Sequence, residues 1–232
     1  MKTIFHTIKK AITYPAIPLD AGQVGNWKSI PIVAGVHADP LVPLGPLSPE
    51  ADSLTTSSIY FGEHDNSPYA KPENKLAGSL LTLFARRSTA RRLLVAEQLL
   101  PDDYHLIVFD AYRPYEVQKS LYDFYKQKLS EKYPDMDNAT LEQETQKYVS
   151  LPSTDSTRPS PHNTGGVVDV AIIGPGGDML DFGTPFDHGG EKSALAYYES
   201  KIANGEELSE DDLRARDNRR LLFWVMTQAG FQ

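Results

Sequence analysis

Cysteine is absent from this sequence of 232 residues. Its absence excludes disulfide bridges, thiolate zinc sites and cysteine nucleophiles. A metal ion would therefore have to be held by histidine, aspartate or glutamate side chains. The available histidines are His6, His37, His64, His105, His162 and His188.

Long apolar runs are absent as well. No stretch approaches the ~18 consecutive apolar residues that a transmembrane helix needs. The first ten residues are basic, but residues 11–20 contain two prolines and an aspartate where a secretory signal has its apolar core. These features predict a cytoplasmic protein without a membrane partner.

Basic residues are fewer than acidic ones. The 23 lysines and arginines against 31 aspartates and glutamates give a formal net charge of -8. This charge argues against nucleic acid or an anionic membrane as the main partner, because both attract basic surfaces. We therefore expect a small-molecule substrate.

The amino-terminal quarter of the chain differs in composition from the rest. Residues 14–56 are rich in proline, glycine and serine and contain few periodic stretches, apart from one expected strand within Trp27–Val36. We interpret residues 1–56 as a loop-rich arm that wraps the protein. Residues 57–232 then form one domain of ordinary size.

Apolar residues three or four positions apart predict the helices. Thr140, followed three residues later by Gln143, predicts a capping box at the start of one helix. Ser209 is expected to cap the last helix, which runs to Gly230. The helix that Thr140 opens spans Leu141–Val149, and the other expected helices span Thr89–Leu100, Glu116–Tyr133 and Glu191–Ile202.

Two apolar, β-branched runs, His105–Phe109 and Val167–Ile173, predict strands. Leu76–Phe84 is apolar enough for a strand or the start of a helix. Gly174–Gly177 resembles a hairpin turn that returns through Met179–Phe182. Since helices and strands are partly segregated, we expect an α+β fold with an antiparallel sheet flanked by helices.

One segment contains two residues that can bind a metal. A loop carries His162, two glycines follow it, and Asp169 lies in the next apolar strand. Imidazole nitrogen and carboxylate oxygen both bind zinc, and a cation would compensate for burying Asp169. The alternative is a solvent-exposed histidine and an aspartate bonded to backbone amides, which spacing alone favours.

Two further segments carry charged groups in turns. Arg113, in the sequence Asp110-Ala-Tyr-Arg-Pro114 after a strand, is able to stabilise an oxyanion, or it simply pairs with Asp110. Asp187, at the end of Phe182-Gly-Thr-Pro-Phe-Asp187, is able to bind a substrate ammonium group, or it forms an Asx turn. Local sequence alone favours the structural interpretation of both.

Taken in this order, the segments resemble motifs of the zinc D-alanyl-D-alanine dipeptidases, the family of the vancomycin-resistance dipeptidase. Asp110–Pro114 resembles its arginine motif, Ser160–Asp169 matches its first metal motif, and Phe182–Asp187 resembles its Met-Gly-Thr-x-Phe-Asp segment. Asn218–Phe231 resembles the helix before its last motif. The resemblance extends from about Tyr60 to the last residue.

This resemblance implies an α+β zinc fold shared with D,D-carboxypeptidases. It implies that His162 and Asp169 bind zinc and that Arg113 stabilises the tetrahedral intermediate. Ser160, Tyr60 and Asp187 would line the dipeptide site, with Tyr60 and Asp187 near the free amine.

The family places a Glu-x-x-His strand after this last helix, and its glutamate and histidine serve as general base and third zinc ligand. The present sequence ends at Gln232, before such a motif, and contains no other Glu-x-x-His. With two ligands we expect weaker zinc binding, and without the glutamate less catalysis. Three alternatives follow: a zinc dipeptidase, an inactive relative that binds D-Ala peptides, or a related zinc D,D-carboxypeptidase.

Overall fold

The computed structural model describes residues 13–22, 39–62, 67–186, 188 and 190–232. The chain divides into a smaller unit, Met1–Gln23 with Asp181–Trp224, and a larger unit, Val24–Leu180 with Val225–Gln232. The described part of the expected amino-terminal arm is therefore shared between the two units. The strand expected within Trp27–Val36 lies outside the described residues.

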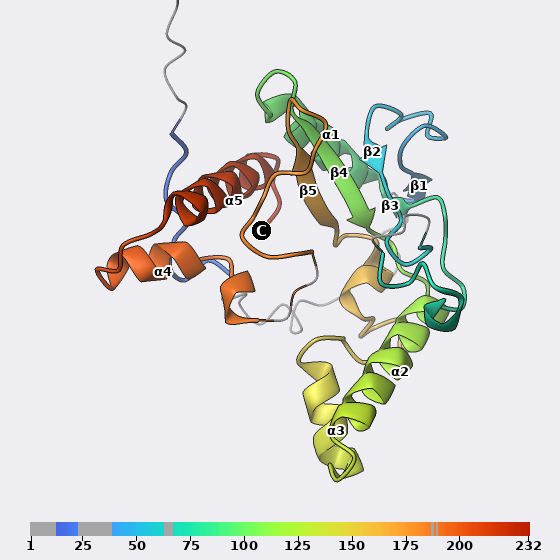
Figure 1. Ribbon diagram of the computed structural model, residues 1–232. Coiled ribbons are helices and arrows are strands. Elements are labelled where there is room, and N and C mark those ends of the chain that lie inside the picture. The colour runs from blue at the N-terminus through green and yellow to red at the C-terminus, as the bar shows by residue number, and fades with distance from the viewer. Residues whose placement is uncertain (1–12, 23–38, 63–66, 187, 189) are drawn as a thin grey trace, which may run out of the picture. The chain divides into compact units, whose positions relative to one another are not determined.

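The larger unit contains two small sheets (Figure 1). In the first, β1 (Leu41–Pro43) pairs with β3 (Phe84–Arg86) in the antiparallel sense. In the second, β4 (His105–Asp110) lies between β2 (Thr55–Thr56) and β5 (Asp169–Ile173).

The pairing in the second sheet departs in part from the expected antiparallel pattern. β4 and β5 are antiparallel, whereas β2 and β4 are parallel. Parallel neighbours need a long crossover connection, and here the chain between β2 and β4 includes β3 and a helix. A strand of two residues has too little sequence pattern to reveal this pairing.

The β4–β5 ladder contains an irregularity that matters for the site. Val108 pairs with Val170, but the next pair is Asp110 with Asp169, so Phe109 is an extra residue on β4. Such a bulge redirects the side chains that follow it. It places the two aspartates opposite each other at the end of the sheet.

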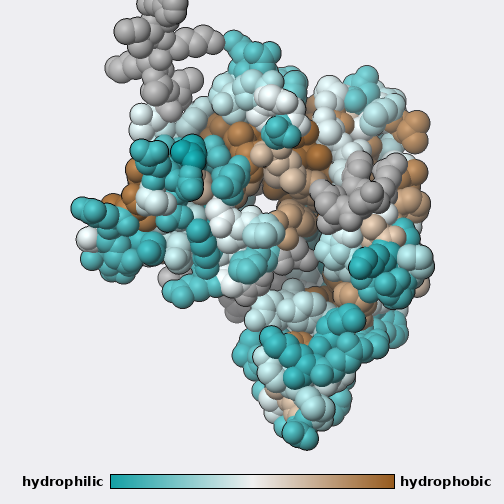
Figure 2. All heavy atoms as spheres, in the orientation of Figure 1, coloured by the Kyte–Doolittle hydropathy of each residue, from teal (hydrophilic) through white to brown (hydrophobic). Residues whose placement is uncertain are grey.

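Helix α1 (Arg87–Leu99) confirms the helix expected over Thr89–Leu100 and buries Leu93 and Ala96. Helix α2 (Tyr115–Lys132) confirms its prediction, and its buried face packs in a core that includes Tyr60, Tyr69 and Val149. Helix α3 (Asn138–Gln146) lies beside α2 (Figure 1). The surface over these two helices is mostly hydrophilic in the view of Figure 2.

The capping prediction for α3 is wrong. The helix begins earlier, and the Asp137 carboxylate accepts the backbone N–H groups of Ala139 and Thr140 at 3.0 and 3.1 Å. Aspartate is a somewhat better N-cap than threonine. The cap therefore lies at Asp137, three residues before the expected Thr140.

Two other predictions concern the connections of the larger unit. Of the expected element Leu76–Phe84, only Phe84 lies in a strand, and Pro72–Asn74 is a 3-10 turn designated η2. The turn at Gly174–Gly177 is confirmed, since the Gly174 N–H donates to the Asp178 carbonyl at 2.9 Å. The return strand is reduced to one bridge, between Ile173 and Met179.

In the smaller unit, the helix expected over Glu191–Ile202 is divided. A 3-10 turn, η4 (Glu191–Ser193), is separated from α4 (Tyr197–Ala203) by residues 194–196, which are not helical. The last helix, α5 (Glu210–Gln228), belongs to this unit up to Trp224. It begins after Ser209, whose hydroxyl accepts the Asp212 N–H as expected. No helix among the described residues has the length and apolarity to cross a membrane.

Candidate active site

The candidate site lies in the larger unit, where the turn after β4 meets the loop before β5. The Arg113 N–H donates to the His162 carbonyl at 3.2 Å, so two motifs distant in sequence are joined by backbone. His162 lies in a 3-10 turn, η3 (Pro161–Thr164), which ends at Gly165 in the left-handed conformation. The structure thus brings together the predicted arginine and metal segments.

His162 and Asp169 face each other. The imidazole Nε2 lies 3.7 Å from a carboxylate oxygen of Asp169, and the His162 side chain is largely buried. The opposite ring nitrogen, Nδ1, lies 2.9 Å from the Ala111 carbonyl oxygen. A proton on Nδ1 satisfies that carbonyl and leaves the Nε2 lone pair directed at Asp169, as metal ligation requires.

Asp169 is less buried than the sequence indicated. It is the first residue of β5 rather than an interior one, and its side chain is 36% exposed. The prediction started the strand at Val167, but the ladder with β4 begins two residues later, at Asp169. The argument that a cation must compensate a fully buried Asp169 is therefore weaker, while its position beside His162 supports a metal site.

The pair fits a zinc ion by its spacing. Two ligand bonds of ~2.1 Å that meet at a tetrahedral angle separate the ligand atoms by roughly 3.4 Å, close to the 3.7 Å between His162 and Asp169. Asp110, His162 and Asp169 form a group whose ligand atoms lie within 4.8 Å of one another.

Asp110 supports the other two residues of this group. Its Oδ2 atom lies 3.0 Å from Nδ1 of His162, the nitrogen that faces away from Asp169. The same oxygen accepts hydrogen bonds from Arg113 Nε at 3.0 Å and Nη2 at 2.5 Å. We therefore interpret Asp110 as the carboxylate that orients the imidazole rather than as a third ligand.

The acidic neighbours shift the titration of His162. Burial alone would lower the pKa of His162, but the hydrogen bond and charge of Asp110, together with the charge of Asp169, raise it above its ordinary value. Without a metal, the site therefore favours the protonated, positively charged form of the His162 imidazole.

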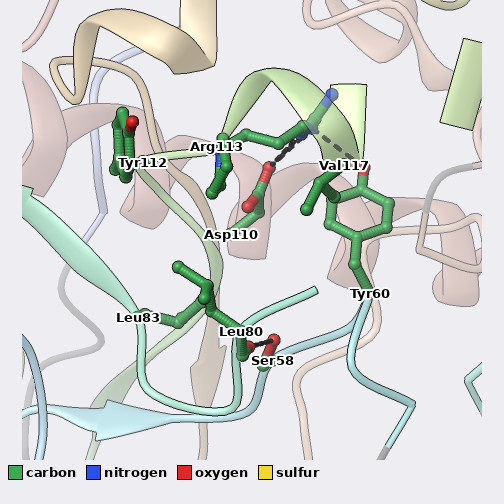
Figure 3. A pocket seen from close by; sticks show the side chains of 9 residues that line it. Ser58, Tyr60, Leu80, Leu83, Asp110, Tyr112, Arg113 and Val117 are labelled. Atoms are coloured by element: carbon green, nitrogen blue, oxygen red, sulfur yellow. Dashed lines mark hydrogen bonds and ion pairs between the residues drawn. The ribbon is translucent and has the colours of Figure 1, made fainter. Parts of the chain in front are cut away.

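Arg113 is buried and held on several sides (Figure 3). Besides its two bonds to Asp110, it donates from Nη1 to the Gln118 side chain at 2.8 Å and from Nη2 to the Tyr60 hydroxyl at 2.9 Å. Burial by itself would lower the pKa of Arg113, but Tyr60 and Asp110 raise it, so the guanidinium stays charged. These bonds use four of its five N–H groups.

The expected substrate residues have different positions. Tyr60 is buried, and its ring lies against the Arg113 guanidinium at 4.6 Å, so it is a neighbour of the arginine. Ser160 is also buried, and its hydroxyl donates to the Asn163 side chain. Asp187 lies outside the described residues.

Sequence reasoning missed two residues that hold the site together. The side-chain amide of Asn163 donates to the Arg113 carbonyl. This bond joins the turn that carries His162 (Pro161–Thr164, the metal turn) to the turn that carries Arg113 (residues 110–114, the arginine turn). Gln118, fully buried, connects Arg113 to the Ser150 carbonyl at 2.6 Å. The only local signal was their proximity in sequence to His162 and Arg113.

A small cavity of about 10 Å³ lies between Arg113 and the apolar side chains of Leu80, Leu83 and Val117 (Figure 3). This volume is near the lower limit for a single water. A dipeptide is much larger than this space.

The comparisons with known proteins agree with the geometry. The family model described as D-ala-D-ala dipeptidase matches residues 57–232. The chain belongs to this family. A relative in Synechocystis, named D-alanyl-D-alanine dipeptidase, is 26% identical over 159 residues, which cover 66% of this chain. The matched part spans 64% of the relative's length.

The chain thus belongs to a family of peptidases, and its structure holds a group of residues, Asp110, His162 and Asp169, that could hold a metal ion directly or orient its ligands. The match includes both turns of the candidate site.

Proposed function

We propose that this chain carries the zinc and oxyanion-binding part of a D-alanyl-D-alanine dipeptidase. The observation that carries the proposal is the opposition of His162 Nε2 and Asp169 at 3.7 Å, in a turn bonded to that of Arg113. The family match and the named relative support the substrate.

When bound, zinc would polarise the peptide carbonyl and acidify the attacking water. The protein's own contribution begins with Arg113, which retains one N–H on Nη1 after its bonds to described residues. Pointed at the carbonyl oxygen, that N–H would stabilise the negative charge that develops there. Asp110 keeps both the imidazole and the guanidinium in place during this step.

Hydrolysis also needs a general base that accepts a proton from the attacking water. Of the carboxylates in the described cluster, Asp110 is bonded to Arg113 and Asp169 is assigned to the metal. The family resemblance gives the base and the third ligand to a Glu-x-x-His strand. We expect full activity to require those two groups.

The decisive experiment measures D-Ala release from D-Ala-D-Ala with added zinc. It compares the chain as given with a version extended by a Ser-Glu-Trp-Trp-His-type strand. We expect activity to rise by about 10²–10⁴-fold on extension. Inactivity of both would contradict the dipeptidase proposal and favour an inactive relative that binds D-Ala peptides. Preferential cleavage of longer peptides ending in D-Ala-D-Ala would indicate a carboxypeptidase instead.

A metal analysis tests the ligand assignment independently of activity. His162→Ala should abolish stoichiometric zinc binding. The control is His105→Ala, because His105 is exposed and pairs with Glu97 away from the site. Equal zinc content in wild type and His162→Ala would show that the metal is held elsewhere.

A further inference from the structure

The metal turn and the arginine turn share a support that neither motif contains. The β1–β3 ribbon lies against both of them. The Phe84 carbonyl accepts the Tyr112 N–H at 2.7 Å, next to Arg113, and the Arg86 N–H donates to the Gly165 carbonyl at 2.9 Å, close to His162. One strand of three residues thus contacts both halves of the site.

The side chain of Arg86 adds to these backbone bonds. Its Nε donates to the Thr164 carbonyl at 2.9 Å, and its Nη1 donates to the Asp39 carbonyl at 3.0 Å. The first carbonyl belongs to the turn that carries His162, and the second belongs to the segment that enters β1. The guanidinium therefore connects the amino-terminal segment to the metal turn.

Gly165 shows how closely the two segments approach. Its φ is +72°, and a Cβ atom placed on it would lie 2.7 Å from Leu41 Cδ2 in β1. A side chain at residue 165 would therefore require the Leu41 side chain to move. The Leu41 side chain of β1 thus packs directly against the turn that follows His162.

We propose that Arg86 is a positioning residue for the metal centre, acting by holding the His162 turn against the amino-terminal segment through the carbonyls of Thr164 and Asp39. This inference rests on the proposed zinc function. It assigns residues 39–43, which precede the matched family region, a role in setting zinc affinity.

The test is the zinc dissociation constant of the full chain, measured by competition with a chromophoric chelator. We expect Arg86→Met to weaken binding by about 10–100-fold, as for other residues that orient metal ligands. The direction of the change in zinc affinity separates a positioning effect from a charge effect. Removing a positive charge near a cation site would, by electrostatics alone, strengthen zinc binding.

Arg87→Met is the matched control. It removes the same charge one residue away, but the Arg87 side chain pairs with Glu50 at the surface, 2.9 Å distant. Its zinc affinity should stay within about twofold of wild type. Unchanged or tighter binding in Arg86→Met, with the chain folded by circular dichroism, would overturn the proposal.

Arg86→Lys separates charge from geometry. Lysine keeps the positive charge but lacks the two fixed donor directions of a guanidinium. We expect it to bind zinc nearly as weakly as Arg86→Met. Wild-type affinity in the lysine variant would contradict the role of the paired carbonyl bonds.

A second route does not alter Arg86 and serves if Arg86→Met fails to fold. Gly165→Ala should weaken zinc binding, and adding Leu41→Ala should recover part of the loss by removing the contact with β1. Because the backbone strain at residue 165 is the same in both variants, the recovery reports the contact alone. A double variant no better than Gly165→Ala would count against the coupling.

A readout without metal distinguishes this proposal from the proposed function. The imidazole resonances of His162 in the metal-free chain, at one fixed pH, should shift in Arg86→Met and not in Arg87→Met. If wild type binds no zinc but this shift is seen, the zinc function fails while the positioning role stands. Unshifted resonances would refute the positioning role.

Discussion

At the scale of single residues, Asp110 is the side chain that contacts both the predicted arginine and the predicted metal ligand His162. One of its oxygens is bonded to Arg113 and lies beside His162 Nδ1. We predict that Asp110→Asn lowers zinc affinity by about 10–100-fold and destabilises the chain by about 3–5 kcal/mol, because a buried guanidinium loses its counterion. Urea unfolding and chelator competition measure the two effects.

Asp123→Asn provides the comparison, since Asp123 pairs with Lys119 on the exposed surface of α2. Its stability should change by less than about 1 kcal/mol. Equal effects of the two substitutions would mean that Asp110 does not hold a buried charge.

The pH dependence of the metal-free chain follows from His162. Because its folded pKa is raised, its charged form stabilises the native state fully below the unfolded pKa, and this contribution is lost as pH rises through the folded value. The stability difference between wild type and His162→Gln should therefore be larger at pH 6 than at pH 9. Denaturant titrations at both values measure it, and a difference that grows with pH would be inconsistent with the raised pKa.

At the scale of elements, the sequence predicted most helices and the central strands. α1, α2 and α5 follow from apolar residues at helical spacing, because each buries one face. β4 follows from a continuous apolar run, because both of its faces are buried. The parallel partner β2 and the bulge in β4 were not predictable, since both depend on contacts between distant segments.

The residues of the candidate site also divide into those that the sequence predicted and those that it did not. His162, Asp169 and Arg113 were found because their segments resemble known motifs, and the structure brings them together. Asn163, Gln118 and Arg86 were missed, because a hydrogen bond to a remote carbonyl leaves no periodic trace in the sequence.

In the smaller unit, the approach of Gly183 to α4 allows a sharp test. A Cβ atom on Gly183 would lie 1.9 Å from the Tyr198 hydroxyl, whereas one on Gly205 would meet nothing within 4 Å. Both glycines have positive φ, so alanine costs about 1–2 kcal/mol at either from the backbone alone. Gly183→Ala should lose a further ~1–3 kcal/mol from overpacking.

Thermal unfolding of the two alanine variants measures the difference. Adding Tyr198→Phe to Gly183→Ala removes the closest atom and should restore part of the stability. Equal melting temperatures for Gly183→Ala and Gly205→Ala would contradict the packing argument.

At the scale of the whole molecule, zinc should act as a stabilising ligand of the native chain. At a free concentration 100 times the dissociation constant, binding adds about 2.7 kcal/mol to the free energy of unfolding. The melting temperature should therefore rise with zinc and fall on chelation. His162→Ala should abolish the response, and magnesium should not reproduce it, since the imidazole ligand favours zinc. A rise in melting temperature with zinc that persists in His162→Ala would show that zinc stabilises the chain at another site.

The restraint of Arg113 has a consequence for the design of inhibitors. An arginine side chain loses about 2 kcal/mol of rotamer entropy when it is ordered, and here folding already orders it through Asp110, Gln118 and Tyr60. A ligand that meets it does not bear that loss. With four of five donors engaged, the guanidinium offers a single N–H rather than a two-pronged fork. Compounds with one anionic oxygen in a tetrahedral group should therefore be preferred over flat carboxylates, whose strongest pairing with arginine uses two parallel donors.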